Sequence, residues 1–162
     1  MKQTYSELPV STLYNEITFY SQFTLDLLNA REEVIIESPF ITIKRLKMLK
    51  NVFAKLIERN DQIFIFTKDP LEQDKTMEKQ SEAGISYFEE LGAQVLLVKG
   101  SHHRKLAIID QKILWEGSLN ILSQSYSREF MRRIDSKVLS REMFTFLKYN
   151  TLNIFKEEQD LL

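Results

Sequence analysis

The sequence of 162 residues contains no cysteine, only two histidines, four glycines and three prolines. Without cysteine there can be no disulfide framework, thiolate metal site or cysteine nucleophile. The first 30 residues contain one basic residue, Lys2, and no unbroken apolar run. We therefore expect neither a secretory signal nor a membrane span, and we predict a cytoplasmic protein without a membrane partner.

The remaining composition is that of a folded domain. Hydrophobic residues make up 43% of the chain and aromatic residues 11%, so it can bury a core and is not globally disordered. The length fits one compact domain, and no repeat, low-complexity tract or glycine/serine linker divides the sequence. We predict a single domain over residues 1–162.

The order of the apolar segments predicts an α/β protein. The expected helices cover residues 12–29, 44–58, 74–91 and 140–156. The expected strands cover residues 33–37, 62–67, 93–98, 105–110, 112–115 and 129–134, with a tight turn at 110–111 and a short helix or loop at 121–127. Buried strands that alternate with helices predict a mixed, largely parallel β-sheet flanked by helices on both faces.

The charges are segregated although the net charge is only −1. Residues 38–57 carry five positive charges and no negative one, and residues 99–141 carry nine positive and four negative charges. If these segments share a face, an anionic polymer could dock there. The alternative is that both are ordinary solvated surfaces.

One segment combines residue types that suit phosphate chemistry. Alternate side chains of a strand share a face, so His103 and Lys105 would project together. The hairpin that follows would return Gly117, Ser118 and Asn120 to the neighbourhood of His103. Lysine supplies charge, serine and asparagine supply donors, and glycine permits close backbone approach. The imidazole can attack phosphorus or transfer protons near neutral pH.

The spacing resembles a known signature. A lone histidine or a lone Gly-Ser-x-Asn is usually structural, but the six fixed residue types together have a chance frequency on the order of 10⁻⁶ in this chain. The pattern His103-x-Lys105-x4-Asp110-x6-Gly117-Ser118-x-Asn120 resembles, without a gap, the motif of the phospholipase D superfamily. Weaker similarity covers roughly residues 25–140 and includes segments 34–42 and 127–129. His102 does not fit the spacing, and we expect no catalytic role for it.

The resemblance implies a phosphodiesterase that needs no metal and no cofactor. One histidine attacks phosphorus, a second protonates the leaving oxygen, and water activated by the second then releases the phosphate. The catalytic set implied is His103, Lys105, Asp110, Ser118, Asn120 and Glu129, with Glu129 orienting His103 and Asp110 in a more structural supporting role. Because one imidazole cannot be both nucleophile and acid in one step, the single motif predicts a homodimer with a shared active site.

The substrate stays open between three hypotheses. Short single-motif members of the superfamily resemble bacterial nucleases, and similar domains occur attached to helicases and restriction enzymes, so a partner of that kind is one expectation. The basic stretches favour DNA, and the expected substrate contacts are Lys44, Arg45, Lys47 and Arg104. The alternatives are a phosphodiesterase for lipid or small-molecule diesters, and a non-catalytic nucleic-acid-binding module.

Overall fold

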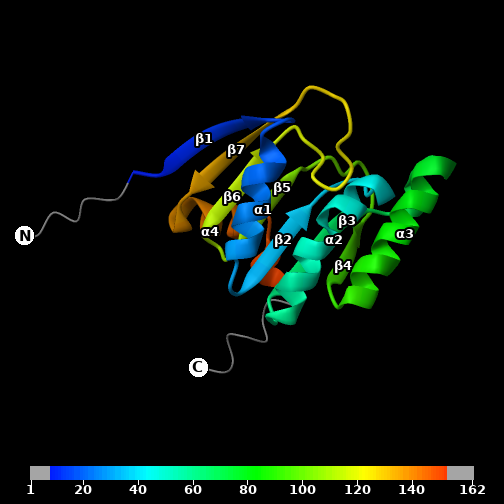
Figure 1. Cartoon of the computed structure of the whole chain (residues 1–162), viewed down its shortest axis with the longest axis horizontal. Helices are drawn as coiled ribbons and strands as arrows, with labels where there is room; N and C mark the ends of the chain where they lie inside the picture. The colour runs from blue at the N-terminus through cyan, green and yellow to red at the C-terminus, as the bar shows by residue number, and fades with distance from the viewer. Residues whose placement is uncertain (1–7, 153–162) are drawn as a thin grey trace, which may run out of the picture.

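The computed structural model describes residues 8–152. The strands are β1 (Val10–Asn15), β2 (Glu33–Glu37), β3 (Gln62–Lys68), β4 (Gln94–Val98), β5 (Leu106–Ile109), β6 (Ile113–Gly117) and β7 (Phe130–Asp135). The helices are α1 (Phe19–Asn29), α2 (Ile43–Glu58), α3 (Lys75–Leu91) and α4 (Lys137–Phe146), with 3₁₀ turns η1 (Pro70–Glu72) and η2 (Tyr149–Thr151) (Figure 1).

The described strands form one seven-stranded sheet in the order β1-β7-β6-β5-β2-β3-β4. The mixed α/β class is confirmed, but the expectation of a largely parallel sheet is wrong. Only β2–β3 and β3–β4 are parallel, and the other four pairings are antiparallel. The antiparallel β5–β6 pair follows from the tight turn after β5, where Asp110 and Gln111 both have positive φ, so that β6 returns directly without a crossover helix.

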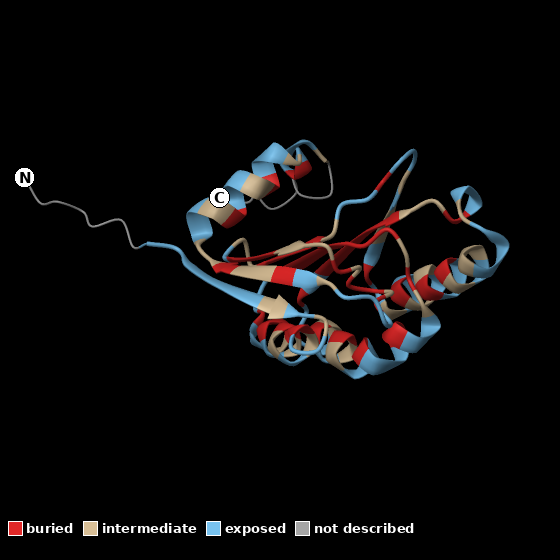
Figure 2. Cartoon of the chain, turned by 90° about the horizontal axis from the view of Figure 1, so that it is seen from above, coloured by how far each residue is buried: buried red, intermediate tan, exposed pale blue. Residues whose placement is uncertain are grey.

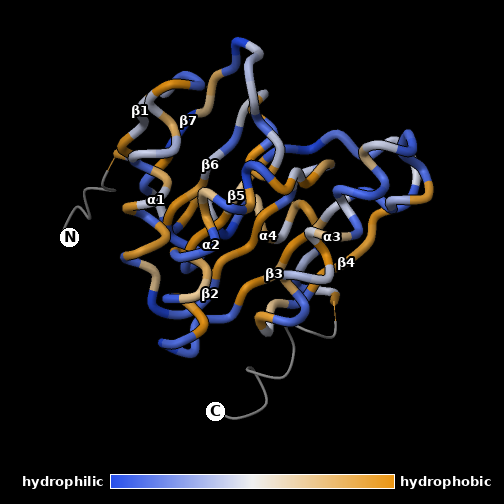
Figure 3. The backbone as a smooth tube through the Cα atoms, turned by 45° about the vertical axis from the view of Figure 1, so that its right-hand side comes forward, coloured by the Kyte–Doolittle hydropathy of each residue, from blue (hydrophilic) through white to orange (hydrophobic). Residues whose placement is uncertain are grey.

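Helices cover both faces of the sheet, as expected. Helices α1, α2 and α3 pack on one face, and α4 with η2 packs on the other (Figure 2). Alternate residues of β2 show the division, because Ile36 belongs to the core under α1–α3 and Ile35 to the core under α4. The central strands are hydrophobic along most of their length, whereas the loops at the ends of the sheet are mostly hydrophilic (Figure 3).

The N-terminal prediction of one helix over residues 12–29 is wrong in its first part. Residues 10–15 form edge strand β1, which pairs antiparallel with β7, and α1 begins only at Phe19. Asn15 separates the two elements, since its Oδ1 accepts hydrogen bonds from the backbone N–H groups of Ile17 and Thr18, each at 3.0 Å. This local side-chain turn interrupts a spacing that reads as continuous helix.

The last helix also differs from the prediction of residues 140–156. Helix α4 begins at Lys137, where Ser136 caps it by accepting the N–H of Leu139 at 3.2 Å, and it ends at Phe146. Lys148 then adopts a left-handed conformation with φ of 61°, which starts η2. Residues 153–156 lie outside the described residues. The other predicted helices and strands agree with the structure to within about one or two residues.

No helix within residues 8–152 is both long and apolar enough to cross a membrane. The cytoplasmic location stays a prediction.

Candidate active site

The segment that carries His103 and Lys105 enters the sheet at one end of β5. Strand β5 begins at Leu106, which pairs with Glu37 at the end of β2 and with Glu116 of β6. His103 and Lys105 therefore precede the strand rather than projecting from it. They stay close, because the Lys105 ammonium donates a hydrogen bond to the backbone oxygen of His103 at 2.6 Å. The His103 side chain is exposed, so its imidazole is accessible from solvent.

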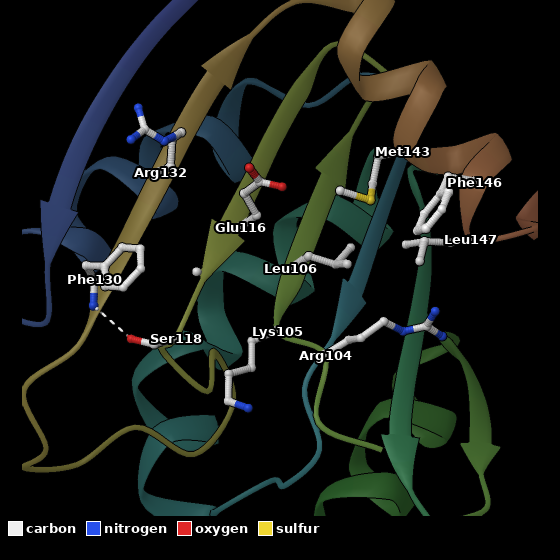
Figure 4. Close-up of a pocket in the computed structure, with 11 residues that line it drawn as sticks. Arg104, Lys105, Leu106, Glu116, Ser118, Phe130, Arg132, Met143, Phe146 and Leu147 are labelled. Atoms are coloured by element: carbon white, nitrogen blue, oxygen red, sulfur yellow. Dashed lines mark hydrogen bonds between the residues drawn. The ribbon is translucent and has the colours of Figure 1, made fainter. Parts of the chain in front are cut away.

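A pocket of about 540 Å³ opens beside this segment (Figure 4). Its lining consists of Arg104, Lys105, Leu106, Glu116, Gly117, Ser118, Phe130, Arg132, Met143, Phe146 and Leu147. Three positions of the predicted motif, at 105, 117 and 118, thus meet at one pocket. His103 and Asn120 are not among the lining residues, so the pocket brings together only part of the predicted set.

Gly117 and Ser118 are fixed by the first residues of β7. The N–H of Ser118 donates to the Phe130 oxygen at 3.0 Å, and the Phe130 N–H donates back to the Ser118 hydroxyl oxygen at 3.1 Å. The hydroxyl proton therefore remains available for a ligand. A Cβ at Gly117 would lie 2.2 Å from the Phe130 oxygen and 2.9 Å from the Cα of Met131, so only glycine permits this approach.

Asn120 and Glu129 lie at the two ends of the loop between β6 and β7. The Asn120 backbone oxygen accepts from Ser123 and Gln124, whereas its buried Oδ1 has no hydrogen-bond partner among the described residues. An unsatisfied buried amide oxygen is costly unless a further donor pairs with it. Glu129 directly precedes β7, and its N–H donates to the Glu16 carboxylate at 3.1 Å.

Asp110 lies at the opposite end of β5 from the pocket. Its carboxylate accepts hydrogen bonds from three consecutive backbone N–H groups, those of Arg31 at 3.0 Å, Glu32 at 2.9 Å and Glu33 at 3.1 Å. These bonds hold the loop before β2 against the β5–β6 turn. The structure therefore separates Asp110 from His103 and gives the carboxylate a structural role.

Beneath the pocket lies a buried polar cluster that the sequence reasoning missed. Glu37 has no exposed surface, and its Oε1 accepts a hydrogen bond from the Tyr149 hydroxyl at 2.5 Å. Its Oε2 pairs with the Nε of Arg104 at 2.8 Å and lies 3.9 Å from the Nε2 of His102. Arg104 is half-exposed and also lines the pocket, so Glu37 holds a pocket cation from below. The available signal was a glutamate that ends an otherwise buried apolar strand.

Burial controls the protonation of this cluster. Burial lowers the pKa of His102 to about 4, and the neighbouring charges of Arg104, His103 and Lys105 act in the same direction. His102 is therefore neutral at pH 7, and its approach to Glu37 is not an ion pair. Burial also raises the pKa of Glu37, against the opposing effects of the Tyr149 hydrogen bond and the Arg104 charge.

The predicted basic contacts on α2 have different environments. The prediction that Arg45 binds substrate is wrong, because its buried guanidinium donates to the Gln124 oxygen through Nε at 3.2 Å and Nη2 at 2.7 Å. It also lies 3.7 Å from the centroid of the Tyr20 ring. Arg45 thus anchors the β6–β7 loop to α2. Lys44 and Lys47 are exposed, and Lys44 donates to the hydroxyl of Tyr126 in that loop at 3.2 Å.

Comparison with known proteins decides the family. A family model described as cardiolipin synthase, PLD-like domain, matches residues 25–148. The chain belongs to the phospholipase D superfamily. This confirms the resemblance inferred from the motif and places the pocket in a domain family of phosphodiesterases. A comparison of the sequence with curated proteins gives no significant match.

Solved structures share the fold at low sequence identity. NucT from Helicobacter pylori superposes with a TM-score of 0.68 at 20% identity, covering 86% of this chain and 93% of NucT. Nuc from Salmonella typhimurium, a phospholipase D family member, has a TM-score of 0.70 at 14% identity and covers 86% and 91%. Phosphatidylserine synthase from Haemophilus influenzae has a TM-score of 0.63 at 15% identity, covering 85% of this chain and 38% of the synthase. Each of these likenesses covers 85% or 86% of this chain.

Proposed function

We propose that this protein is a metal-independent phosphodiesterase that cleaves nucleic acid, DNA in particular, as a homodimer. The observation that carries the proposal is the meeting of Lys105, Gly117 and Ser118 at one pocket. The exposed His103 directly precedes the lining residue Arg104, and its backbone oxygen accepts a hydrogen bond from the Lys105 ammonium. A lysine ammonium, a free hydroxyl proton and a close-lying backbone are the groups that bind the non-bridging oxygens of a phosphodiester.

The proposed reaction has two steps. A nitrogen of the neutral His103 imidazole attacks phosphorus and forms an N–P bond, while the P–O bond to the leaving group breaks. His103 of the partner subunit, in its protonated form, gives its proton to the leaving oxygen. That same imidazole, now neutral, takes a proton from water as the water oxygen attacks phosphorus. The N–P bond breaks, and a phosphate monoester leaves with both imidazoles restored.

The homodimer follows from the single copy of the motif. Two imidazoles with opposite protonation are needed at one phosphorus, and each chain supplies one. The exposure of His103 supports this proposal, since a second copy can reach an imidazole at the surface. A two-fold axis beside the pocket would bring the two residues together.

A polyanionic substrate is supported by the charges that surround the pocket. Arg104, Lys105 and Arg132 line it, against one carboxylate, Glu116. Lys44 adds a further exposed cation over the loop that follows Asn120, because it bonds to Tyr126 of that loop. Arg104, with Lys44 and Lys47, remains a proposed contact for the phosphate backbone.

A lipid or small-molecule diester is the second candidate. The observation that favours it is the apolar side of the pocket, formed by Met143, Phe146 and Leu147. An acyl chain or another apolar substituent could lie against these side chains. Phosphatidylserine synthase, named for a lipid product, shares the fold.

The test is a digestion panel in the presence of EDTA. Plasmid DNA, single-stranded DNA, RNA and a phosphatidylcholine vesicle are incubated separately with wild-type protein, His103→Ala and the surface control Lys75→Ala. We expect cleavage of nucleic acid by wild type and Lys75→Ala, and none by His103→Ala. Release of a headgroup from the vesicle without nucleic-acid cleavage would favour the hypothesis of a lipid phosphodiesterase. Nucleic-acid binding without any hydrolysis would favour a non-catalytic binding module.

A further inference from the structure

The pocket is an uncovered part of the sheet face on which α4 packs. Leu106, Glu116 and Arg132 are cross-strand neighbours in β5, β6 and β7, so their side chains form one row on this face. The next row, which contains Ile108 and Leu114, is buried under α4. The helix thus covers one part of the face and leaves the part nearest the motif open.

Two large aromatic side chains stand exposed at this opening. Phe130 is 55% exposed and Phe146 is 77% exposed, and both line the pocket. Phe130 lies on one side, and Phe146 with Met143 and Leu147 on the other, while Lys105 and Ser118 lie along its lower edge in the view of Figure 4. Aromatic rings left in solvent beside a phosphate-binding motif favour a ligand with an apolar, flat part.

The cations of the pocket decide which ligand fits. Arg104 lines the pocket, and the ion pair of its Nε with the buried Glu37 carboxylate at 2.8 Å restricts its side chain. With Lys105 and Arg132 it gives three lining cations, of which Arg104 is already paired with Glu37, against one lining carboxylate, Glu116. An acyl chain would leave these cations unpaired. A nucleotide satisfies both features, since its phosphate pairs with cations and its base stacks on aromatic rings.

We propose that this pocket binds the nucleoside that adjoins the scissile phosphate, with its base against Phe130 and Phe146. The proposal rests on the nucleic-acid function above and specifies its substrate. A base inside a duplex is stacked and paired, and it would have to be extruded to reach the rings. Single-stranded nucleic acid offers its bases without that cost, so the preferred substrate class is single-stranded.

The experiment removes the ring and the base separately and together. The substrates are the dinucleoside phosphate of two thymidines, which has a single phosphodiester, and its two analogues that lack one base each. The kcat/KM of each is measured with wild type, Phe130→Ala and Phe146→Ala. The control is Val138→Ala, since Val138 is also exposed on α4, at 76%, but lies outside the pocket.

We expect each phenylalanine substitution to lower kcat/KM for the complete substrate by about 5- to 100-fold, as stacking on an aromatic ring predicts. On one of the two abasic analogues the same substitutions should have little effect, because the partner of the ring is already missing. Val138→Ala should behave as wild type on all three substrates. Single-stranded DNA should be cleaved faster than the same sequence in a duplex.

Equal fold losses on the complete and both abasic substrates would overturn the proposal, since they would show damage to the site rather than loss of stacking. This comparison is needed because the Phe130 backbone also holds Ser118. Dissociation of the dimer by Phe130→Ala or Phe146→Ala, measured by sedimentation, would overturn it in favour of a subunit interface. Failure of wild type to cleave any nucleic acid would instead refute the proposed function itself.

Discussion

His102 provides a stability prediction whose size can be worked out. The residue is 5% exposed, and burial holds the pKa of its imidazole at about 4 against an ordinary value of 6.5. The unfolded chain takes up a proton near pH 6.5, whereas the folded chain does so only near pH 4. Acid therefore favours the unfolded state. The stability contributed by the neutral His102 is present above pH 6.5 and is lost as the pH falls toward 4.

Between pH 7 and pH 5 this linkage removes about 2 kcal/mol from the free energy of unfolding, at 1.36 kcal/mol per pKa unit. The raised pKa of Glu37 acts in the opposite sense, since its contribution is present at low pH and is lost as the pH rises through the folded pKa. A comparison of variants at each pH separates the two groups.

The assay is urea denaturation at pH 7 and pH 5 of wild type, His102→Gln and His103→Gln at one protein concentration. Wild type and His103→Gln should lose about 2 kcal/mol more than His102→Gln on acidification, because the exposed neighbour lacks the burial of His102. An equal loss in wild type and His102→Gln would refute the reasoning, and so would disappearance of the extra loss in His103→Gln.

Three further predictions concern other parts of the molecule. Asp110→Ala should lower the free energy of unfolding by about 2 kcal/mol, because three backbone N–H groups lose their acceptor. It should change the kcat of the folded protein little. A large loss of kcat with normal stability would show that Asp110 acts in catalysis. Lys44→Gln with Lys47→Gln should reduce the slope of log binding constant against log salt by about 2 for every DNA sequence, whereas an unchanged slope would exclude both lysines as phosphate contacts. Activity should survive EDTA, since the proposed steps use imidazoles alone; loss in EDTA with recovery in magnesium would contradict this.

The local patterns of the sequence predicted most of the elements and the family. Short β-branched runs and helical spacing located β2 to β7 and α2 and α3 because each signal lies within one segment. The motif could be found for the same reason, as His103 and Asn120 are only 17 positions apart along a hairpin. The pocket at positions 105, 117 and 118 follows from that hairpin.

The unpredicted features depend on contacts between distant parts of the chain. Tyr149 reaches Glu37 over 112 positions, and Arg45 is captured by Gln124 over 79. No local spacing pattern predicts such a pair, so the sequence alone suggests that Arg45 is one more exposed cation. Asp110 fits the family motif by its spacing. Its carboxylate nevertheless accepts hydrogen bonds from backbone N–H groups at the start of β2. Only the packed sheet reveals which role the carboxylate has.

The central claim is that two copies of His103 serve one phosphorus atom. It is tested most directly with mixed dimers, in which one tagged wild-type subunit pairs with one differently tagged His103→Ala subunit. The mixed dimers are purified through both tags and assayed on single-stranded DNA in EDTA. The mixed dimers should lose nearly all activity, because each composite site lacks either the nucleophile or the acid. Mixed dimers that retain about half the wild-type activity would show two independent sites and would contradict the shared-site mechanism.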